Sequence, residues 1–411
     1  MAPSALPEGE SAPPEGTLPA SAAYQAESRD FGLYLHVPFC AVRCGYCDFN
    51  TYTATELEGA SQRDYPSHAK AEVDFAARVL SESGVPARPL STIFFGGGTP
   101  TLVGPEPLID MLHHARDVVG VTEDAEVTVE ANPDSVSSDD LEALASAGVT
   151  RVSFGVQSFD PQVLATLDRT HDPDRVPSVV HSAKQAGLQV SVDLIYGTPG
   201  ESLESWRSTV ESALELEPDH VSAYALIVEK GTALAARISR GELAAPEDDA
   251  QAEMYALTDD LLVDAGYSWY EVSNWAKTPD HVSRHNLAYW TSQDWWGVGP
   301  GAHSHVGGVR WWNVKHPRAY ASRMSQGISP AHAREVLSDS AVEMERVLLG
   351  IRVREGLDAS LVTQEHRPLL AQWVSRGLID GEELLAGRVV ATQKGRLVAD
   401  FLARELTESP R

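Results

Sequence analysis

The sequence predicts an α/β protein whose core is a partial (β/α)6 barrel, followed by a smaller C-terminal α+β domain. Two observations lead to this prediction. Short apolar runs alternate with longer helix-like stretches, a rhythm typical of a parallel sheet covered by helices. Glycine-rich and polar motifs follow the apolar runs directly, and the carboxyl ends of the strands form the active face of a βα barrel.

Six apolar runs are predicted to be strands: Gly32–Val37, Thr92–Phe95, Ala125–Glu130, Arg151–Val156, Gln189–Tyr196 and His220–Leu226. The stretches between them are predicted to be helices: Ser67–Glu82, Pro105–Val118, Ser138–Ala147, Pro173–Ala186 and Ser202–Leu216. Six units favour a curved, partly open barrel over a closed barrel of eight strands.

The chain is predicted to divide into four parts. Residues 1–29 consist largely of Pro, Ala, Ser, Gly and Glu, so we expect a disordered tail with little to bury. Residues 30–230 form the βα core. Residues 231–334 begin with a predicted helix over Glu247–Ala265 and then contain seven of the nine tryptophans between Tyr267 and Trp312. We expect this aromatic-rich extension to complete the site.

Residues 335–411 are predicted to form a small helical domain resembling a winged helix. Gly387–Ala391 is the candidate for a β-hairpin wing, and Lys394–Leu406 is the closing helix. A winged helix suggests DNA binding, but this segment carries no excess of basic residues.

Charge and hydropathy exclude several functions. The net charge is −27, from 59 acidic and 32 basic residues, and such a surface repels nucleic acids and anionic membranes. No run of 18 apolar residues is present, so at most peripheral membrane contact is expected. The N-terminal residues do not have the pattern of a signal peptide, and the thiols are grouped. These features predict a cytoplasmic protein.

All three cysteines, Cys40, Cys44 and Cys47, fall within eight positions. Their Cx3Cx2C spacing places three soft thiolates on one loop after the first predicted strand. Three thiolates can hold three irons of a [4Fe–4S] cluster and leave the fourth iron open to a small molecule, as S-adenosylmethionine cleavage requires. A structural zinc site remains an alternative, with His36 as the local fourth ligand.

Other strand ends carry candidate ligand-binding residues. Gly96–Pro100 lets backbone groups approach a ligand closely, although a plain tight turn has the same composition. Glu130, Arg169 and Asp193 are charged residues in apolar surroundings, which suits either a bound ligand or an internal salt bridge. Gln157 is a hydrogen-bonding residue at the same predicted mouth.

A second group of candidate ligand-binding residues is His285-Asn-Leu-Ala-Tyr-Trp290, followed by the glycine-rich segment 297–305. A flat aromatic ligand can stack on such residues, and a histidine can ligate iron. A histidine in aromatic surroundings is also a common core residue, so both interpretations of His285 stay open.

Taken together, these motifs resemble the radical SAM family of oxygen-independent coproporphyrinogen III oxidases over residues 31–405. The fold is then a partial (β/α)6 radical SAM barrel. The resemblance implies that Cys40, Cys44 and Cys47 bind a [4Fe–4S] cluster. It also implies a first S-adenosylmethionine site lined by Tyr34, Gly97, Gly98, Thr99, Glu130 and Arg169. Gln157 and Asp193 match positions that the oxidase uses toward a second S-adenosylmethionine, and the implied heme motif comprises His285, Asn286, Tyr289 and Trp290.

Within this family the chain is more similar to the heme-chaperone branch than to the oxidases. The oxidases have a further cysteine two residues after the third, where this chain has Phe49, and an N-terminal segment that shapes their substrate site. The resemblance implies a chaperone that binds heme, passes it to recipient hemoproteins and takes electrons from a donor. The alternatives are a coproporphyrinogen III oxidase and a zinc-bound interaction protein.

Overall fold

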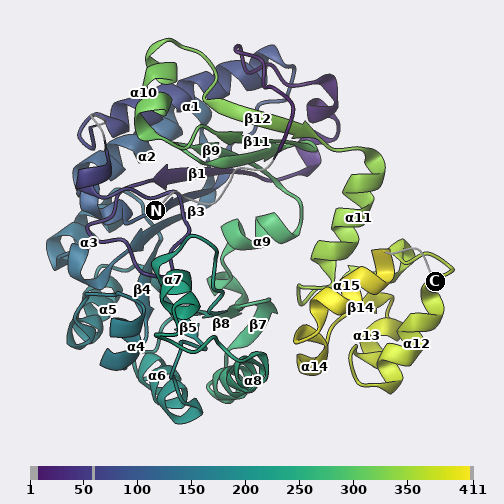
Figure 1. The fold of residues 1–411 in the computed structure, drawn as a ribbon. Helices are drawn as coiled ribbons and strands as arrows, with labels where there is room; N and C mark the ends of the chain where they lie inside the picture. The colour runs from purple at the N-terminus through teal and green to yellow at the C-terminus, as the bar shows by residue number, and fades with distance from the viewer. Residues whose placement is uncertain (1–7, 58–60, 408–411) are drawn as a thin grey trace.

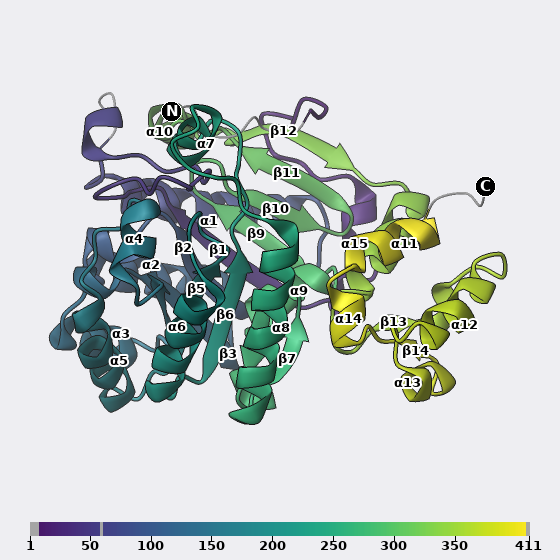
Figure 2. The same cartoon turned by 60° about the horizontal axis from the view of Figure 1, so that its bottom comes forward.

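Six parallel strands form the centre of the molecule in a computed structural model that describes residues 8–57 and 61–407. Each strand pairs with the next in chain order, and their burial is nearly continuous because both faces of the sheet are covered. All six predicted strands are confirmed, with ends shifted by a few residues (Figures 1 and 2): β1 (Phe31–Val37), β2 (Leu90–Gly97), β3 (Val121–Ala131), β4 (Arg151–Gln157), β5 (Gln189–Tyr196) and β6 (His220–Ala225).

Helices connect these strands and pack outside the sheet (Figures 1 and 2). Capping residues fix where several of them begin; Ser137, for example, forms a capping box with Asp140 at the start of α3. The helix predicted over Pro173–Ala186 begins as a 3-10 turn, η6 (Pro173–Arg175), before α5, and the short helix α4 was not predicted. The connecting helices are α1 (Tyr65–Glu82), α2 (Pro105–Val119), α3 (Ser138–Ser146), α4 (Pro161–Thr166), α5 (Val176–Gln185) and α6 (Leu203–Glu215).

The aromatic-rich extension lengthens the same sheet at both edges. β9 (Asp294–Val298) lies parallel to β1 and is followed outward by antiparallel β10 (His303–Val306), β11 (Val309–Asn313) and β12 (Ala331–Val336). At the other edge, β8 (Asn274–Ala276) is antiparallel to β6 and β7 (Ser268–Glu271) is antiparallel to β8. Across the described residues β12 and β7 remain the two ends of the sheet, so the barrel is open, as predicted.

Four further helices complete this part of the chain. They are α7 (Ala233–Ser239), α8 (Asp248–Asp264), α9 (Arg284–Trp290) and α10 (Pro317–Ser325). The long helix predicted over Glu247–Ala265 is confirmed as α8. In the described part of the chain no helix has the length and apolar character needed to cross a membrane.

Residues 8–29 pack against the sheet, so the prediction of a disordered tail is wrong for this segment. It forms two 3-10 turns, η1 (Ala20–Ala23) and η2 (Ala26–Ser28), and Glu10 pairs with Arg334 of β12 through the backbone and through a 2.7 Å ion pair. The reason is tertiary packing, which the local composition does not reveal: the main core buries Leu18, Ala22 and Ala26. Residues 1–7 of the predicted tail lie outside the described residues.

The C-terminal segment has its own hydrophobic core, which includes Ile351, Leu370 and Trp373. A hairpin confined to Gly387–Ala391 does not form, because Arg388–Val389 (β14) pairs with the distant Leu357–Asp358 (β13) and Ala391 forms an antiparallel bridge with Ile379. The closing helix is also divided, since Gly395 packs against the Leu378 carbonyl and the chain turns before α15. The helices here are α11 (Asp339–Gly350), α12 (Arg367–Ser375), α13 (Gly381–Leu385), α14 (Gln393–Arg396) and α15 (Ala399–Thr407).

Candidate functional site

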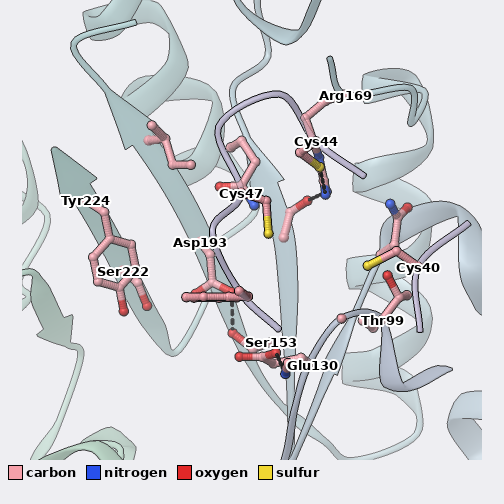
Figure 3. A pocket seen from close by; sticks show the side chains of 18 of the residues that line it. Cys40, Cys44, Cys47, Thr99, Glu130, Ser153, Arg169, Asp193, Ser222 and Tyr224 are labelled. Atoms are coloured by element: carbon pink, nitrogen blue, oxygen red, sulfur yellow. Dashed lines mark hydrogen bonds between the residues drawn. The ribbon is translucent and has the colours of Figure 1, made fainter. Parts of the chain in front are cut away.

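A cavity of about 640 Å³ opens at the carboxyl ends of the parallel strands. Its walls come from the loop after β1, the turn after β2, and the ends of β3 to β6 (Figure 3). The sequence predicted this meeting point. Of the predicted site residues, eleven line the cavity: Cys40, Cys44, Cys47, Gly97, Gly98, Thr99, Glu130, Gln157, Arg169, Asp193 and Asn286.

The three cysteines share the loop after β1, and their thiols are turned toward the cavity (Figure 3). All three are free thiols, and the Cys40 amide donates to the Tyr52 carbonyl at 3.0 Å, which ties the loop to the chain beyond it. Burial, and then the neighbouring Cys47, raises the pKa of Cys40 to about 11. A thiol of this kind becomes a thiolate when a metal centre binds it, because the coordinating ion displaces the proton.

The arrangement fits a cluster better than a single zinc ion. Over residues 8–57 and 61–407, no three His, Cys, Asp or Glu side chains converge as one metal ion requires, whereas a cubane takes one thiolate per iron. His36, the candidate fourth zinc ligand, uses both ring nitrogens elsewhere. Its Nδ1 lies 3.0 Å from the Tyr34 hydroxyl and its Nε2 lies 2.9 Å from the Asn50 carbonyl oxygen.

Arg169 joins the cysteine loop to β4. Its Nη1 donates to Cys44 Sγ at 3.5 Å, and its Nη2 donates to the Gly155 carbonyl. Its polar contacts are thus a thiol and a carbonyl rather than a carboxylate, which argues against the internal salt bridge. The buried Nε has no hydrogen-bond partner in the described structure, so the guanidinium keeps donor capacity for a ligand.

The glycine-rich turn after β2 packs directly against the cysteine loop. A Cβ on Gly98 would lie 2.4 Å from the Phe39 carbonyl oxygen, so a larger residue would push the two loops apart. The Gly98 amide donates to the Val37 carbonyl at 2.8 Å, and the Thr99 amide donates to the Phe39 carbonyl at 2.7 Å. The turn therefore positions the cluster loop while Gly97, Gly98 and Thr99 still face the cavity.

Two buried carboxyl groups lie in the cavity wall. Glu130 accepts a 3.0 Å hydrogen bond from the Gly97 amide, and burial, followed by repulsion from Asp193, raises the pKa of Glu130 to about 8. Asp193 accepts a 2.8 Å hydrogen bond from the Ser153 hydroxyl, and burial also raises its pKa. Gln157 ends β4 with a left-handed φ of 68°, a conformation that costs a non-glycine residue about 1–2 kcal/mol.

Tyr34 is the predicted S-adenosylmethionine residue that the structure does not place in the cavity wall. Its hydroxyl bonds to His36, and its ring stacks beside Phe94 and His285. Tyr34 thus lies one layer behind the wall, where it supports Phe94 of the lining.

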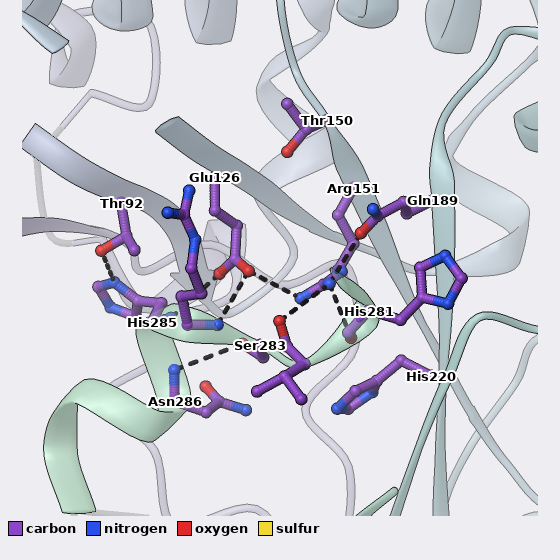
Figure 4. A network of polar contacts seen from close by, with 12 residues as sticks. Thr92, Glu126, Thr150, Arg151, Gln189, His220, His281, Ser283, His285 and Asn286 are labelled. Carbon is purple, nitrogen blue, oxygen red and sulfur yellow. Dashed lines mark hydrogen bonds and ion pairs between the residues drawn. The ribbon is translucent and has the colours of Figure 1, made fainter. Parts of the chain in front are cut away.

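Helix α9 carries the predicted heme motif and closes the opposite end of the barrel from the cysteines. Ser283 caps it, and the Glu126 carboxylate accepts hydrogen bonds from the amides of Arg284 and His285 (Figure 4). The same carboxylate pairs with Arg151 at 3.1 Å. This network anchors the start of α9 to β3 and β4.

His285 is fully engaged inside the protein. Its Nδ1 lies 2.8 Å from the Thr92 hydroxyl, its Nε2 lies 2.8 Å from the Tyr289 hydroxyl, and its ring stacks on Phe94. Burial lowers the pKa of His285 to about 3. Both nitrogens that could ligate iron are therefore occupied, which matches the core-residue interpretation.

The other residues of the predicted heme motif do not share one surface. Asn286 faces the cavity, whereas Tyr289, which packs edge-on against Trp295, and Trp290 do not line it. The heme role of this motif stays a prediction.

Sequence reasoning missed the polar far end of the cavity. Arg151 begins β4, His220 begins β6, and both line the cavity together with Ser222. His220 bonds to the hydroxyls of Ser191 and Tyr270. The available signal was a titratable side chain at the first position of two largely apolar strands.

The open βα barrel and the three-thiol cavity at its strand ends define a radical SAM protein. A family model described as Radical SAM superfamily matches residues 34–213. The solved coproporphyrinogen III oxidase (HemN) from Escherichia coli, a radical SAM enzyme, shares the fold with a TM-score of 0.78. It is 24% identical and the match covers 94% of this chain and 92% of that one.

Two relatives are more similar in sequence. The heme chaperone HemW of Mycobacterium tuberculosis (strain ATCC 25618 / H37Rv) is 47% identical over 377 residues, which cover 92% of this chain and 94% of that protein. The heme chaperone HemW of Bacillus subtilis (strain 168) is 32% identical over 378 residues, which cover 89% and 96%. The chain belongs to the HemW family of radical SAM proteins.

Proposed function

We propose that the protein is a cytoplasmic heme chaperone that carries a [4Fe–4S] cluster and S-adenosylmethionine and delivers heme to hemoproteins. The two relatives named heme chaperone align with this chain over 94% and 96% of their own lengths. The observation that carries the proposal is the cavity itself, which combines three free thiols at one end with an acidic interior.

Cys40, Cys44 and Cys47 would hold the cluster. Gly97, Gly98, Thr99, Glu130 and Arg169 would hold S-adenosylmethionine, with Gln157 and Asp193 as further contacts in the same cavity. When bound, the reduced cluster supplies the electron that cleaves S-adenosylmethionine in radical SAM chemistry. The acidic side chains suit the sulfonium and ammonium charges of that ligand, and the partly free guanidinium of Arg169 suits its carboxylate.

The charge of the cavity disfavours the oxidase alternative. Coproporphyrinogen III carries four carboxylates. Arg151 is engaged by Glu126 and Arg169 by the cysteine loop, and the remaining Nε of Arg169 is assigned to S-adenosylmethionine. A tetra-anionic substrate would therefore meet few free cations in the interior, and burial of an unpaired carboxylate is costly, which disfavours such a substrate there. The acidic side chains of the lining are Asp48, Glu130, Asp134, Asp168, Asp193 and Glu229.

The proposed partners follow from this function. They are heme, recipient hemoproteins and an electron donor for the cluster. The net charge of −27 disfavours contact with nucleic acid, and we expect at most peripheral contact with a membrane.

An anaerobic assay tests the proposal. The reconstituted full chain is incubated with coproporphyrinogen III, S-adenosylmethionine and a reductant, and a parallel sample is titrated with hemin. We expect saturable hemin binding and no formation of protoporphyrinogen IX. Multiple turnover of coproporphyrinogen III would instead establish the oxidase.

A further inference from the structure

Exposed apolar side chains surround the mouth of the cavity. Val42 and Phe49 on the cysteine loop are 52% and 62% exposed, and Tyr224 and Ile227 at the end of β6 are 42% and 67% exposed. All four line the cavity, although the two segments are far apart in sequence. Single exposed apolar residues are ordinary, but a group at one cavity mouth marks a binding surface. We call these four residues the apolar rim.

The cysteine loop, which carries one half of the apolar rim, is anchored to the neighbouring chain segments. The Leu234 amide donates to the Gly45 carbonyl at 2.8 Å, and the Gly45 amide donates to the Leu167 carbonyl at 3.0 Å. Beneath the rim, Tyr46 of the cysteine loop packs on a small hydrophobic cluster that includes Leu226. The apolar rim is thus a supported platform across both sides of the mouth.

Among the described residues, the interior behind the rim offers no free cation beyond Arg169, whose Nε is already assigned to the carboxylate of S-adenosylmethionine. Glu130 and Asp193 lie in its wall, and Arg151 and Arg169 are engaged by protein groups. Heme has apolar faces and two propionates at one edge. Its faces match the apolar rim, whereas its propionates would be buried without a cationic partner in the interior and therefore favour solvent. Lys230, exposed and three residues beyond Ile227, provides a cation in the rim segment.

Helix α9 offers no comparable surface. Both ring nitrogens of His285 are bonded to Thr92 and Tyr289, and His285 is only 2% exposed. Heme would have to break these contacts to reach the imidazole.

We propose that heme binds across the mouth of the barrel, with its macrocycle on Val42, Phe49, Tyr224 and Ile227 and its propionates directed to solvent. This inference rests on the proposed heme-chaperone function and names the place of heme on the molecule. Heme held at the surface over the cluster end is open to a recipient protein, as delivery requires.

The test is a hemin titration of the anaerobically reconstituted full chain, followed by the heme absorption band. The variants are Phe49→Asp, Ile227→Asp and the double variant. Val263→Asp, at a residue that is 54% exposed on α8, is the matched control. Iron, acid-labile sulfide and S-adenosylmethionine binding are measured on each variant. Ile227→Asp lies outside the cysteine loop, so it stays informative if Phe49→Asp impairs cluster assembly.

We expect the double variant to lose at least about tenfold in heme affinity, because it replaces two apolar contacts with charges. The heme affinity of the Val263→Asp control should stay within about twofold of that of the unmodified chain. Unchanged heme affinity in Ile227→Asp and in the double variant would overturn the inference. So would loss of affinity only in His285→Ala, which would return heme to α9.

Two other results would assign the apolar rim to another occupant and overturn the inference. Unchanged heme affinity with slower cluster reduction would assign it to the electron donor. Unchanged heme affinity with loss of a dimer would assign it to a second copy of the chain. If the unmodified chain binds no heme, the proposed function itself fails, so the two failures are distinguishable.

Discussion

The Glu130 carboxylate accepts a 3.0 Å hydrogen bond from the Gly97 amide and so links the end of β3 to the glycine-rich turn after β2. Because the same turn packs on the cysteine loop, this contact connects the acidic wall of the cavity to the thiols. It also places a carboxyl group with a pKa of about 8 where a cationic ligand is expected.

Binding of S-adenosylmethionine should depend on the protonation of Glu130. A cationic ligand favours the carboxylate, so binding releases a proton and affinity rises with pH up to about 8, by at most tenfold per pH unit. Calorimetric titrations at several pH values compare the unmodified chain with Glu130→Gln, which controls for titration of the ligand itself. The same pH slope in both proteins would contradict the assignment.

Glu130→Gln should also change stability in a pH-dependent way. Folding raises the pKa of Glu130 from 4.5 to about 8, so its favourable contribution is complete below pH 4.5 and is lost as pH rises through 8. The variant lacks this loss. The melting temperature of the variant minus that of the unmodified protein should therefore be larger at pH 8.5 than at pH 5.5. A difference that does not vary with pH would show that Glu130 is ionised throughout.

Each of Cys40→Ala, Cys44→Ala and Cys47→Ala should abolish the cluster. Three thiolates hold three irons, so loss of one leaves a second iron without a protein ligand. Iron and acid-labile sulfide are measured after anaerobic reconstitution, and they should fall together. A triple variant that still holds about four irons per chain would refute the assignment.

Arg169→Ala should weaken S-adenosylmethionine binding by about 1.5–3 kcal/mol, the usual value of a charge-assisted hydrogen bond. The guanidinium contacts Cys44 and Gly155, and its Nε is available to a ligand. Calorimetry measures the affinity, and thermal unfolding serves as the control. Unchanged affinity with a lower melting temperature would show that Arg169 only braces the cysteine loop.

Arg396→Ala should release the C-terminal segment from the barrel. Arg396 of α14 pairs with the buried Asp259 of α8 and lies 4.4 Å from the Trp269 ring centroid. Removal of one partner of a buried ion pair costs about 3–5 kcal/mol. Denaturant unfolding and limited proteolysis detect this loss. Arg207→Ala, which breaks an exposed pair with Glu211, is the control and should change stability by less than about 1 kcal/mol.

The sequence was sufficient for the features that depend on local pattern. Strand runs and the spacing of Cys40, Cys44 and Cys47 depend on neighbouring residues, and the rule that functional groups gather at strand ends then placed most of the site. Parallel strands bring Glu130, Gln157 and Asp193 to one edge without further information.

Features that depend on distant contacts were not predictable in the same way. Residues 8–29 fold onto the sheet because Ala22 and Ala26 meet a surface made elsewhere in the chain. The ring of His285 is satisfied by Thr92, which is 193 positions away, so the motif alone could not show that its nitrogens are occupied. The polar far end around Arg151 likewise exists only once β3, β4 and α9 have come together.

Transfer of heme from the chain to a recipient protein is the decisive property of a heme chaperone. The reconstituted full chain is loaded with one equivalent of hemin, freed of excess and mixed with an apo-hemoprotein, and the absorption spectrum is followed with time. We predict that the chain takes up heme and that the spectrum of the recipient's holo form then develops. A chain that never retains heme, or that retains it without release to the recipient, would show that the protein is not a heme chaperone.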